Sequence, residues 1–124
     1  MMRKLLFFVL FLIIAGCSAS KSTSGKIYKK NAEVSYYADK FNGRKTASGE
    51  KFNNNKLTAA HRNLPFGTKL KVTNIANDES VIVEVNDRGP SKKSRELDLS
   101  KKAFMSITDN KNHGVLRTTI SIIK

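Results

Sequence analysis

The stretch Val81-Ile82-Val83-Glu84-Val85-Asn86-Asp87-Arg88-Gly89-Pro90 decides the fold class of this chain. Valine recurs at every second position from residue 81 to residue 85, which is the period of a β-strand with one buried face. The strand runs directly into glycine and proline, which end it. Asp87 therefore stands at the end of a strand, where a side chain is free to reach a substrate instead of the core.

The same alternation predicts five further short strands over residues 32–36, 57–60, 70–72, 97–99 and 120–122. The segment between the first two strands contains the turn signals Asn42-Gly43 and Ser48-Gly49. Ser100 is suited to be the N-cap of a short helix that ends near Ile107. Six short strands and one small helix favour a closed β-barrel over a sandwich, although alternation does not reveal the order of the strands.

Two further motifs add polar groups near strand ends. His61 follows a short strand in Thr58-Ala59-Ala60-His61-Arg62, and Glu50 ends the loop segment Thr46-Ala47-Ser48-Gly49-Glu50. A histidine and carboxylates brought together are the groups that acid–base chemistry uses. Each also has a structural interpretation, because Asp87 is suited to cap its turn and a lone histidine is more often structural.

The first sixteen residues are typical of a secretory signal peptide. Arg3 and Lys4 form a basic start, an apolar run extends from Leu5 to Ile14, and small residues precede Cys17. The apolar run is too short to span a bilayer easily. Ile14-Ala15-Gly16-Cys17 resembles a bacterial lipobox, which predicts lipidation of Cys17, the only cysteine of the chain. Acyl chains would then anchor the protein to a membrane.

Residues 17–30 are rich in Ser, Lys and Gly and are expected to form a lipidated, flexible tether. Residues 31–124 are expected to form one domain, which we predict to be a monomer. Ser18 is not the aspartate that retains lipoproteins in the inner membrane, so an outer-membrane anchor facing the periplasm is expected in a host with two membranes.

The chain carries 23 basic and 10 acidic residues, and loss of Arg3 and Lys4 leaves a net charge of +11. Such a surface attracts polyanions such as anionic lipid or cell-wall polymer. An exported protein does not meet the chromosome, so nucleic acid is the least expected partner. Two scattered histidines and one lipidated cysteine predict no metal site, and no cofactor is expected.

Several stretches between Val34 and Ser100 resemble the rare lipoprotein A family of bacterial envelope lipoproteins, some of which are septal-ring lytic transglycosylases. The matching stretches occur in the family's order and are Ser35-Tyr36-Tyr37, Phe41 to Glu50, Leu57 to Thr68, Val72-Thr73-Asn74, Val85 to Pro90 and Asp98-Leu99-Ser100. The resemblance implies a six-stranded double-psi β-barrel, the fold of expansins and barwin-like proteins. It also implies activity on peptidoglycan in cell-wall remodelling or daughter-cell separation.

The family's presumed catalytic groups correspond to Glu50, His61 and Asp87. The expected substrate-binding residues are Arg44, Arg62, Arg88, Thr58 and Asn86. The arginines are suited to hold carboxylates of the wall, or equally to form ordinary surface ion pairs. Tyr36, Tyr37 and Phe66 are suited to stack on sugar rings, although aromatic residues in strands more often belong to a core.

The chain departs from the family pattern at Ala38, Asn42 and Ser91, where the family usually has glycine, histidine and an aromatic residue. The C-terminal repeat domain of longer members does not follow Lys124 in this sequence. The changes at residues 42 and 91 are expected to alter contacts with substrate. They favour the alternative that this barrel binds peptidoglycan without cleaving it.

A lytic transglycosylase cleaves the bond between N-acetylmuramic acid and N-acetylglucosamine without water, because the muramic 6-hydroxyl attacks the anomeric carbon. One acid–base residue then suffices, in place of the two carboxylates of ordinary glycosidases. We assign this role to Asp87, with His61 orienting it or binding the acetamido group. A hydrolytic glycosidase would need a second carboxylate across the cleft, which Glu50 is suited to provide.

Overall fold

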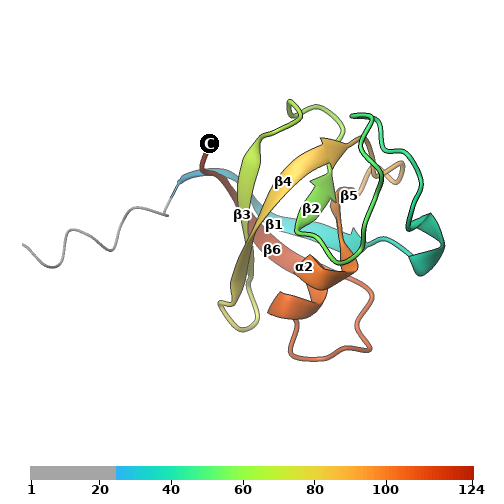
Figure 1. The fold of residues 1–124 in the computed structure, drawn as a ribbon. Coiled ribbons are helices and arrows are strands. Elements are labelled where there is room, and N and C mark those ends of the chain that lie inside the picture. The colour runs from blue at the N-terminus through green and yellow to red at the C-terminus, as the bar shows by residue number, and fades with distance from the viewer. Residues whose placement is uncertain (1–24) are drawn as a thin grey trace, which may run out of the picture.

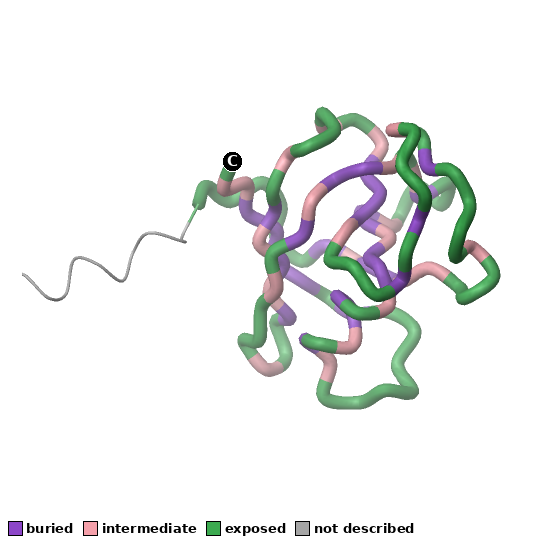
Figure 2. Tube along the Cα trace, viewed as in Figure 1, coloured by how far each residue is buried: buried purple, intermediate pink, exposed green. Residues whose placement is uncertain are grey.

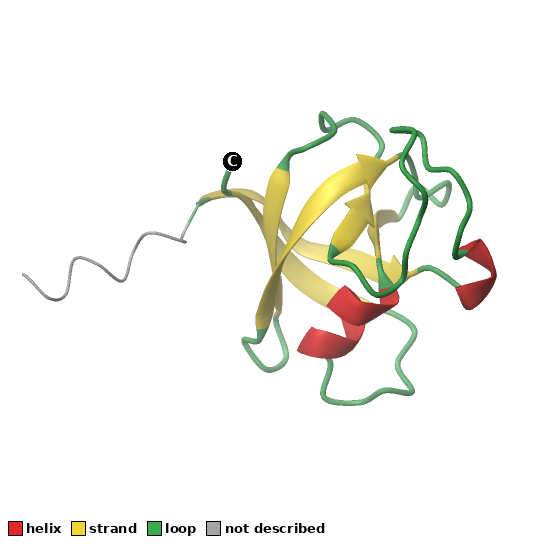
Figure 3. Ribbon diagram, viewed as in Figure 1, coloured by secondary structure: helices red, strands yellow, loops and turns green. Residues whose placement is uncertain are grey.

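The computed structural model describes residues 25–124, which form a closed barrel of six strands (Figure 1). The strands are β1 (Lys26–Tyr36), β2 (Thr58–Ala60), β3 (Lys69–Asn74), β4 (Ser80–Asp87), β5 (Arg95–Leu99) and β6 (Leu116–Ile122). The described helices are α2 (Lys101–Ile107) and the short 3-10 helix η2 (Asp39–Phe41), shown in red in Figure 3. The predicted fold class, mainly β with one short α-helix, is confirmed.

Strand β1 begins five residues before the expected start of the domain. Lys26 pairs with Ile122 and Ile27 pairs with Ser121 of β6, so residues 26–30 belong to the barrel and not to the tether. These five residues are all exposed, so backbone pairing holds them without the apolar alternation that marks a buried strand. Cys17 and the signal peptide lie outside the described residues.

Around the barrel the strands follow the order β1-β5-β2-β4-β3-β6. The pairs β1–β5 and β2–β4 are parallel, and the other four pairs are antiparallel. Strand β2 thus lies between β5 and β4, although 34 residues separate its end from the start of β5. This order places motifs that are distant in the sequence on adjacent strands.

Buried valine and leucine side chains make up most of the barrel core. The buried segments of the chain are purple in Figure 2. Val34, Leu70, Val85 and Leu99 are fully buried, and burial of such a side chain contributes about 1.5–3 kcal/mol. Helix α2 packs against this core through its buried Phe104 and Ile107. The helix begins as predicted, because Ser100 Oγ accepts a hydrogen bond of 3.3 Å from the Ala103 N–H.

Within residues 25–124, no helix has the length and hydropathy needed to cross a bilayer.

Candidate active site

A shift in strand register places two aspartates in one row. Ala59 of β2 pairs with Val85 and with Leu99, whereas Ala60 pairs with Asp87 and with Asp98. Asn86 is skipped in the β2–β4 pairing, so the register shifts by one residue. Paired residues present their side chains to the same face of a sheet, and such irregularities commonly re-aim a side chain beside a functional site. Asp87 and Asp98 therefore flank Ala60 on one face.

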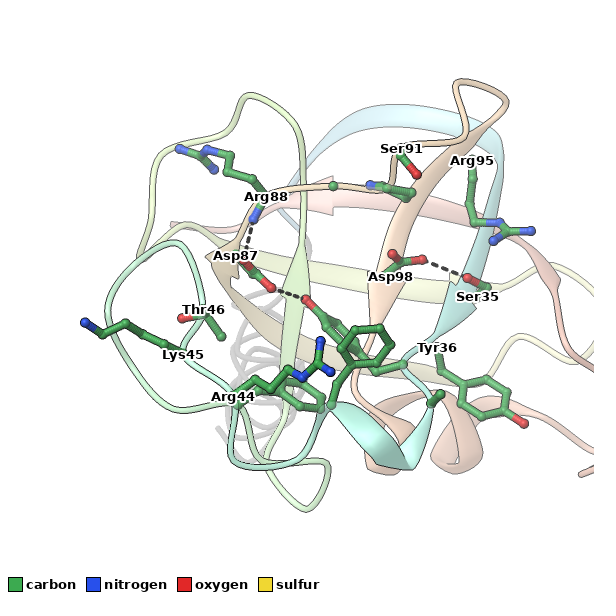
Figure 4. Close-up of a pocket in the computed structure, with 16 residues that line it drawn as sticks. Ser35, Tyr36, Arg44, Lys45, Thr46, Asp87, Arg88, Ser91, Arg95 and Asp98 are labelled. Carbon is green, nitrogen blue, oxygen red and sulfur yellow. Dashed lines mark hydrogen bonds between the residues drawn. The ribbon is translucent and has the colours of Figure 1, made fainter.

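This row opens into a cleft of about 750 Å³. The cleft lies where β1, β4 and β5 approach the loop that follows η2, and Figure 4 shows Asp87 and Asp98 on either side of it. Its polar lining includes Ser35, Tyr37, Thr46 and Ser91 besides the two aspartates. An open, partly aromatic cleft with a few convergent polar groups is the usual form of a ligand site.

Asp87 receives three hydrogen bonds within the cleft. The Tyr37 hydroxyl donates to Oδ2 over 2.6 Å, and the N–H groups of Ala47 and Arg88 donate to Oδ1 over 2.8 and 2.9 Å. Both oxygens of the side chain thus act as acceptors, which suits a carboxylate that receives a proton from substrate. Asp87 stands at the end of β4 as the sequence predicted.

Tyr37 is fixed as the donor of its hydrogen bond. Burial, the hydrogen bond to Asp87 and the charges of Asp87 and Asp98 raise the pKa of Tyr37 far above its usual range. The phenol therefore keeps its proton at every physiological pH and always presents it to Asp87. Its ring stacks on Phe52 with centroids 4.0 Å apart and meets Phe41 edge-on at 5.8 Å.

Asp98 is held more loosely than Asp87. Ser35 Oγ donates to Oδ1 over 2.8 Å, while Oδ2 has no hydrogen bond within residues 25–124 (Figure 4). Small residues leave room around this oxygen: a Cβ at Gly89 would lie 3.9 Å from Oδ2 and 3.9 Å from the Ala60 Cβ. Gly89 also has a φ of +131°, which side chains rarely adopt. The free oxygen of Asp98 is thus available to a ligand.

Aromatic and cationic groups complete the cleft. Phe41, Phe52 and Tyr37 form an aromatic surface that suits the apolar face of a sugar ring. The Arg44 guanidinium lies 5.1 Å from the Phe41 ring centroid and has no ion pair within the described part of the chain. Arg44 is thus suited to the predicted role of binding a substrate carboxylate, whereas Arg95 already pairs with Glu33 at 3.4 Å.

His61 does not line the cleft. The residue is 1% exposed, and its Nε2 lies 2.7 Å from the Glu96 carboxylate. Its Nδ1 accepts hydrogen bonds from the N–H groups of Asn63 and Leu64, over 3.0 and 3.1 Å. Nδ1 is therefore unprotonated and Nε2 donates to Glu96. The prediction that the side chains of His61 and Asp87 converge in one groove is wrong. The His61 ring is held instead by backbone N–H groups of the turn that follows β2.

Glu50 also lies outside the cleft, in a neighbouring pocket. Its Oε1 accepts a hydrogen bond of 3.1 Å from Asn86 Nδ2, and the Ser48 N–H donates to the Asn86 carbonyl over 3.3 Å. These bonds fix the loop from which the Ala47 N–H reaches Asp87. Glu50 thus supports the loop that positions Asp87, and the predicted convergence of the two carboxylates is not observed.

The remaining predicted substrate-binding residues have varied positions. Arg62 donates to the carbonyls of Pro90 and Arg95 over 2.9 and 2.8 Å and is bound within the protein. Arg88 borders the cleft, but its guanidinium donates to the Leu64 carbonyl over 2.8 Å and lies 4.0 Å from the Phe66 centroid. Thr58 and Asn86 line the neighbouring pocket with Glu50.

Sequence reasoning missed Asp98 as a site residue, and it gave Tyr37 a role in stacking on sugar rings but not its hydrogen bond to Asp87. Asp98 stands between Leu97 and Leu99, both fully buried, and a charged residue at the alternate position of a short apolar strand is the available signal. Tyr37 follows the end of β1, where an aromatic residue is as typical of a hydrophobic core as of a binding site. The pairing of both with Asp87 depends on strand order, which alternation does not contain.

Comparison with known proteins identifies the family and the fold of this chain. Residues 23–120 match the protein family described as lytic transglycolase. A relative from Treponema pallidum, named a probable endolytic peptidoglycan transglycosylase RlpA, is 50% identical over 78% of this chain and 30% of its own length. The endolytic peptidoglycan transglycosylase RlpA of Rickettsia felis is 46% identical over 83% of this chain and 46% of its own. The chain thus spans less than half the length of these relatives.

Two solved structures share the fold. The Streptomyces papain inhibitor superposes with a TM-score of 0.62 and 22% identity over 82% of this chain and all of its own. The expansin of Clavibacter michiganensis gives a TM-score of 0.60 and 21% identity over 77% of this chain and half of its own. The predicted six-stranded double-psi β-barrel is confirmed.

Proposed function

This chain belongs to the lytic transglycolase family of double-psi β-barrels, and from that premise we propose that it cleaves peptidoglycan strands as an endolytic transglycosylase. The observation that carries the proposal is the pair Asp87 and Asp98, two carboxylates on one face of an open cleft with an aromatic surface beside them. The names of the relatives supply the substrate, and the cleft supplies groups suited to proton transfer.

In the proposed reaction, an acid protonates the glycosidic oxygen that leaves with N-acetylglucosamine. The muramic 6-hydroxyl attacks the anomeric carbon, so the glycosidic C–O bond breaks and a 1,6-anhydro bond forms. The hydroxyl proton passes to a base, and no water is consumed. Two carboxylates are therefore enough to move both protons.

The hydrogen bonds of the two aspartates suggest how these roles divide. Asp98 Oδ2 has no partner among the described residues, so it is the oxygen that can carry a proton to the leaving group. Asp87 accepts three hydrogen bonds and is suited to receive the proton of the 6-hydroxyl. Asp87 thus keeps an acid–base role, but the acid of the first step moves to Asp98.

The spacing of the aspartates also fits a second reaction. Asp87 and Asp98 lie on strands separated by β2, which places their Cα atoms about 10 Å apart. Two carboxylates that face each other across a gap are also the arrangement of hydrolytic glycosidases. Hydrolysis would leave reducing muramic ends in place of anhydro ends, so the products distinguish the two reactions.

Digestion of purified sacculi followed by mass spectrometry of the soluble fragments tests the proposal. We expect 1,6-anhydromuramic ends, each lighter by one water than a hydrolysed end. The variants Asp87→Asn and Asp98→Asn should release no such fragments. Their matched control is Asp78→Asn, which makes the same chemical change at an exposed turn with φ of +61°, a conformation that asparagine tolerates. Reducing muramic ends would show that the protein is a hydrolase and not the proposed lyase. Binding to sacculi with no release would identify a non-catalytic peptidoglycan-binding protein.

We also propose that a lipid on Cys17 anchors the protein to a membrane of the cell envelope, the outer membrane in a host with two membranes. Strand β1 starts at Lys26, nine residues after Cys17, and ends at the cleft with Tyr36. Eleven residues of strand extend about 35 Å, so an anchored barrel would hold its cleft away from the bilayer. Cys17→Ser should release the protein from membranes or leave it unprocessed, and fractionation identical to the wild type would contradict lipidation.

A further inference from the structure

A second pocket, also of about 750 Å³, lies beside the cleft. Its lining includes Thr58 and Glu84, which pair across β2 and β4. Thr58 lies two residues before Ala60, which pairs with Asp87. Side chains two residues apart along a strand share a face. The second pocket and the cleft therefore open on the same face of the β2–β4 pair.

A hairpin formed by residues 44–52 separates the two spaces. Its two arms are joined by the Lys45–Lys51 bridge and by the Thr46 N–H, which donates to the Glu50 carbonyl over 2.7 Å. Lys45 and Thr46 line the cleft, whereas Glu50 and Lys51 line the second pocket. A polymer bound in the cleft can thus reach the second pocket by passing this one hairpin.

The charges of the second pocket favour an anion. Lys51, Lys56 and Lys102 line it, and their ammonium groups form no ion pair or hydrogen bond within residues 25–124. The opposing charge of Glu84 is matched by Lys69 at 3.7 Å. Glu50 alone adds an unmatched negative charge, so an excess of positive charge remains.

Two buried polar atoms at the same place also have no partner. Thr58 Oγ1 and Asn86 Oδ1 are buried and form no hydrogen bond within the described part of the chain. Asn86 is 6% exposed, and the bond from its Nδ2 to Glu50 fixes the direction of its amide. Buried polar groups normally find partners. The Thr58 hydroxyl can donate to an acceptor on a ligand, whereas Asn86 Oδ1 is itself an acceptor and needs a donor.

We propose that the second pocket binds a carboxylate of the cell-wall polymer whose glycan occupies the cleft. This inference rests on the proposed function, because it takes the ligand to be the same peptidoglycan strand. The lysines would bind the carboxylate, and the Thr58 hydroxyl would donate to it. Muramic acid carries a carboxylate either on its lactyl group or, when a stem peptide is attached, on the peptide.

Titration of the ¹⁵N-labelled protein, followed by NMR, tests the proposal with three probes. The disaccharide of N-acetylglucosamine and muramic acid carries a free lactyl carboxylate, its peptide-bearing form carries peptide carboxylates, and di-N-acetylchitobiose carries none. We expect one or both carboxylate probes to shift the amide signals of Lys51, Lys56 and Lys102, and chitobiose to leave them unchanged. A response to the disaccharide alone identifies the lactyl group, and a response to the peptide form alone identifies the peptide.

The double variant Lys56→Gln with Lys102→Gln should weaken binding of the responding probe about tenfold, because two ion pairs are lost. Lys111→Gln, at an exposed lysine of the loop before β6, is the matched control and should bind as the wild type does. Wild-type affinity in the double variant, or equal shifts from chitobiose, would overturn the proposal. Anhydro products without any shift in the second pocket would refute this inference alone. Shifts without cleavage of sacculi would refute the proposed activity and leave the pocket standing.

Discussion

The cleft of Asp87 and Asp98 and the pair of His61 and Glu96 are neighbouring regions with opposite properties. Both contain carboxylates near strand ends, and they are adjacent in the fold. The backbone N–H of His61 donates to the backbone carbonyl of Asp87 over 3.1 Å. The cleft is open and contains an Asp98 oxygen that has no partner among residues 25–124. The His61 ring is buried and each of its nitrogens is hydrogen-bonded. Residue type alone therefore does not identify a catalytic group. Access and an unoccupied hydrogen-bonding site are also needed.

The difference predicts two kinds of mutational effect. Changes of the two aspartates to asparagine should lower activity with little effect on stability. Both residues are partly exposed, and an amide oxygen in the same place can still accept the hydrogen bonds from Tyr37 and Ser35. Changes at the His61–Glu96 pair should lower stability with little effect on the activity of the folded molecules. The following variants test this separation.

The largest effect is expected for Asp87→Asn. The amide keeps the shape of the side chain but exchanges no proton, so activity on sacculi should fall by about a thousandfold or more. The urea midpoint of unfolding should change little. A variant that keeps its activity, or that loses activity only because it unfolds, would assign Asp87 to the turn and not to the reaction.

His61→Ala should have the largest effect on stability. It removes a buried ring and leaves the Glu96 carboxylate without its histidine partner, which together should cost about 2–4 kcal/mol in the free energy of unfolding. Urea denaturation measures this loss. Activity per folded molecule should stay near the wild-type value. An inactive but fully folded variant would show that His61 takes part in the reaction.

The pH dependence of stability should report the same pair on a smaller scale. Burial opposes ionisation of Glu96, but the hydrogen bonds from His61 and Lys29 outweigh it and lower the pKa of this carboxyl below its usual value of 4.5. A carboxyl with a lowered pKa in the folded state stabilises the protein above its unfolded pKa, and the contribution is lost as pH falls. Unfolding free energies should therefore decrease as the pH drops below about 4.5. In Glu96→Gln the decrease should be shallower, and an unchanged slope would count against the ion pair.

The smallest effect is expected for Glu50→Gln. The new amide oxygen can still accept the hydrogen bond from Asn86 Nδ2, so the loop that carries Ala47 should keep its place. Activity should remain within about threefold of the wild type, whereas Glu50→Ala should lose more because the bond disappears. If Glu50→Gln is as inactive as Asp87→Asn, the Glu50 carboxylate itself takes part in the reaction.

Strand alternation and turn residues predicted the barrel, the helix and the place of Asp87, because these depend on local patterns. The alternation of Val81, Val83 and Val85 and the glycine and proline after Asp87 are sufficient for that part of the structure. The start of β1 could not be predicted, since residues 26–30 are held by pairing with β6 and remain exposed.

The composition of the site depended on features that no local pattern contains. Asp98 and Asp87 face the same cleft because β2 lies between β4 and β5 and because the pairing skips Asn86. His61 turns away because two backbone N–H groups of the following turn bind its ring. Strand order and register are set by the whole barrel, so both outcomes require the structure.

The most direct test of the catalytic cleft is the kcat/KM of Asp98→Asn on peptidoglycan strands, measured beside its urea midpoint. We predict that kcat/KM falls at least about a hundredfold, while the urea midpoint and the near-ultraviolet circular dichroism match the wild type. A folded Asp98→Asn protein with kcat/KM within about threefold of the wild type would contradict the assignment of the two aspartates as the reacting pair.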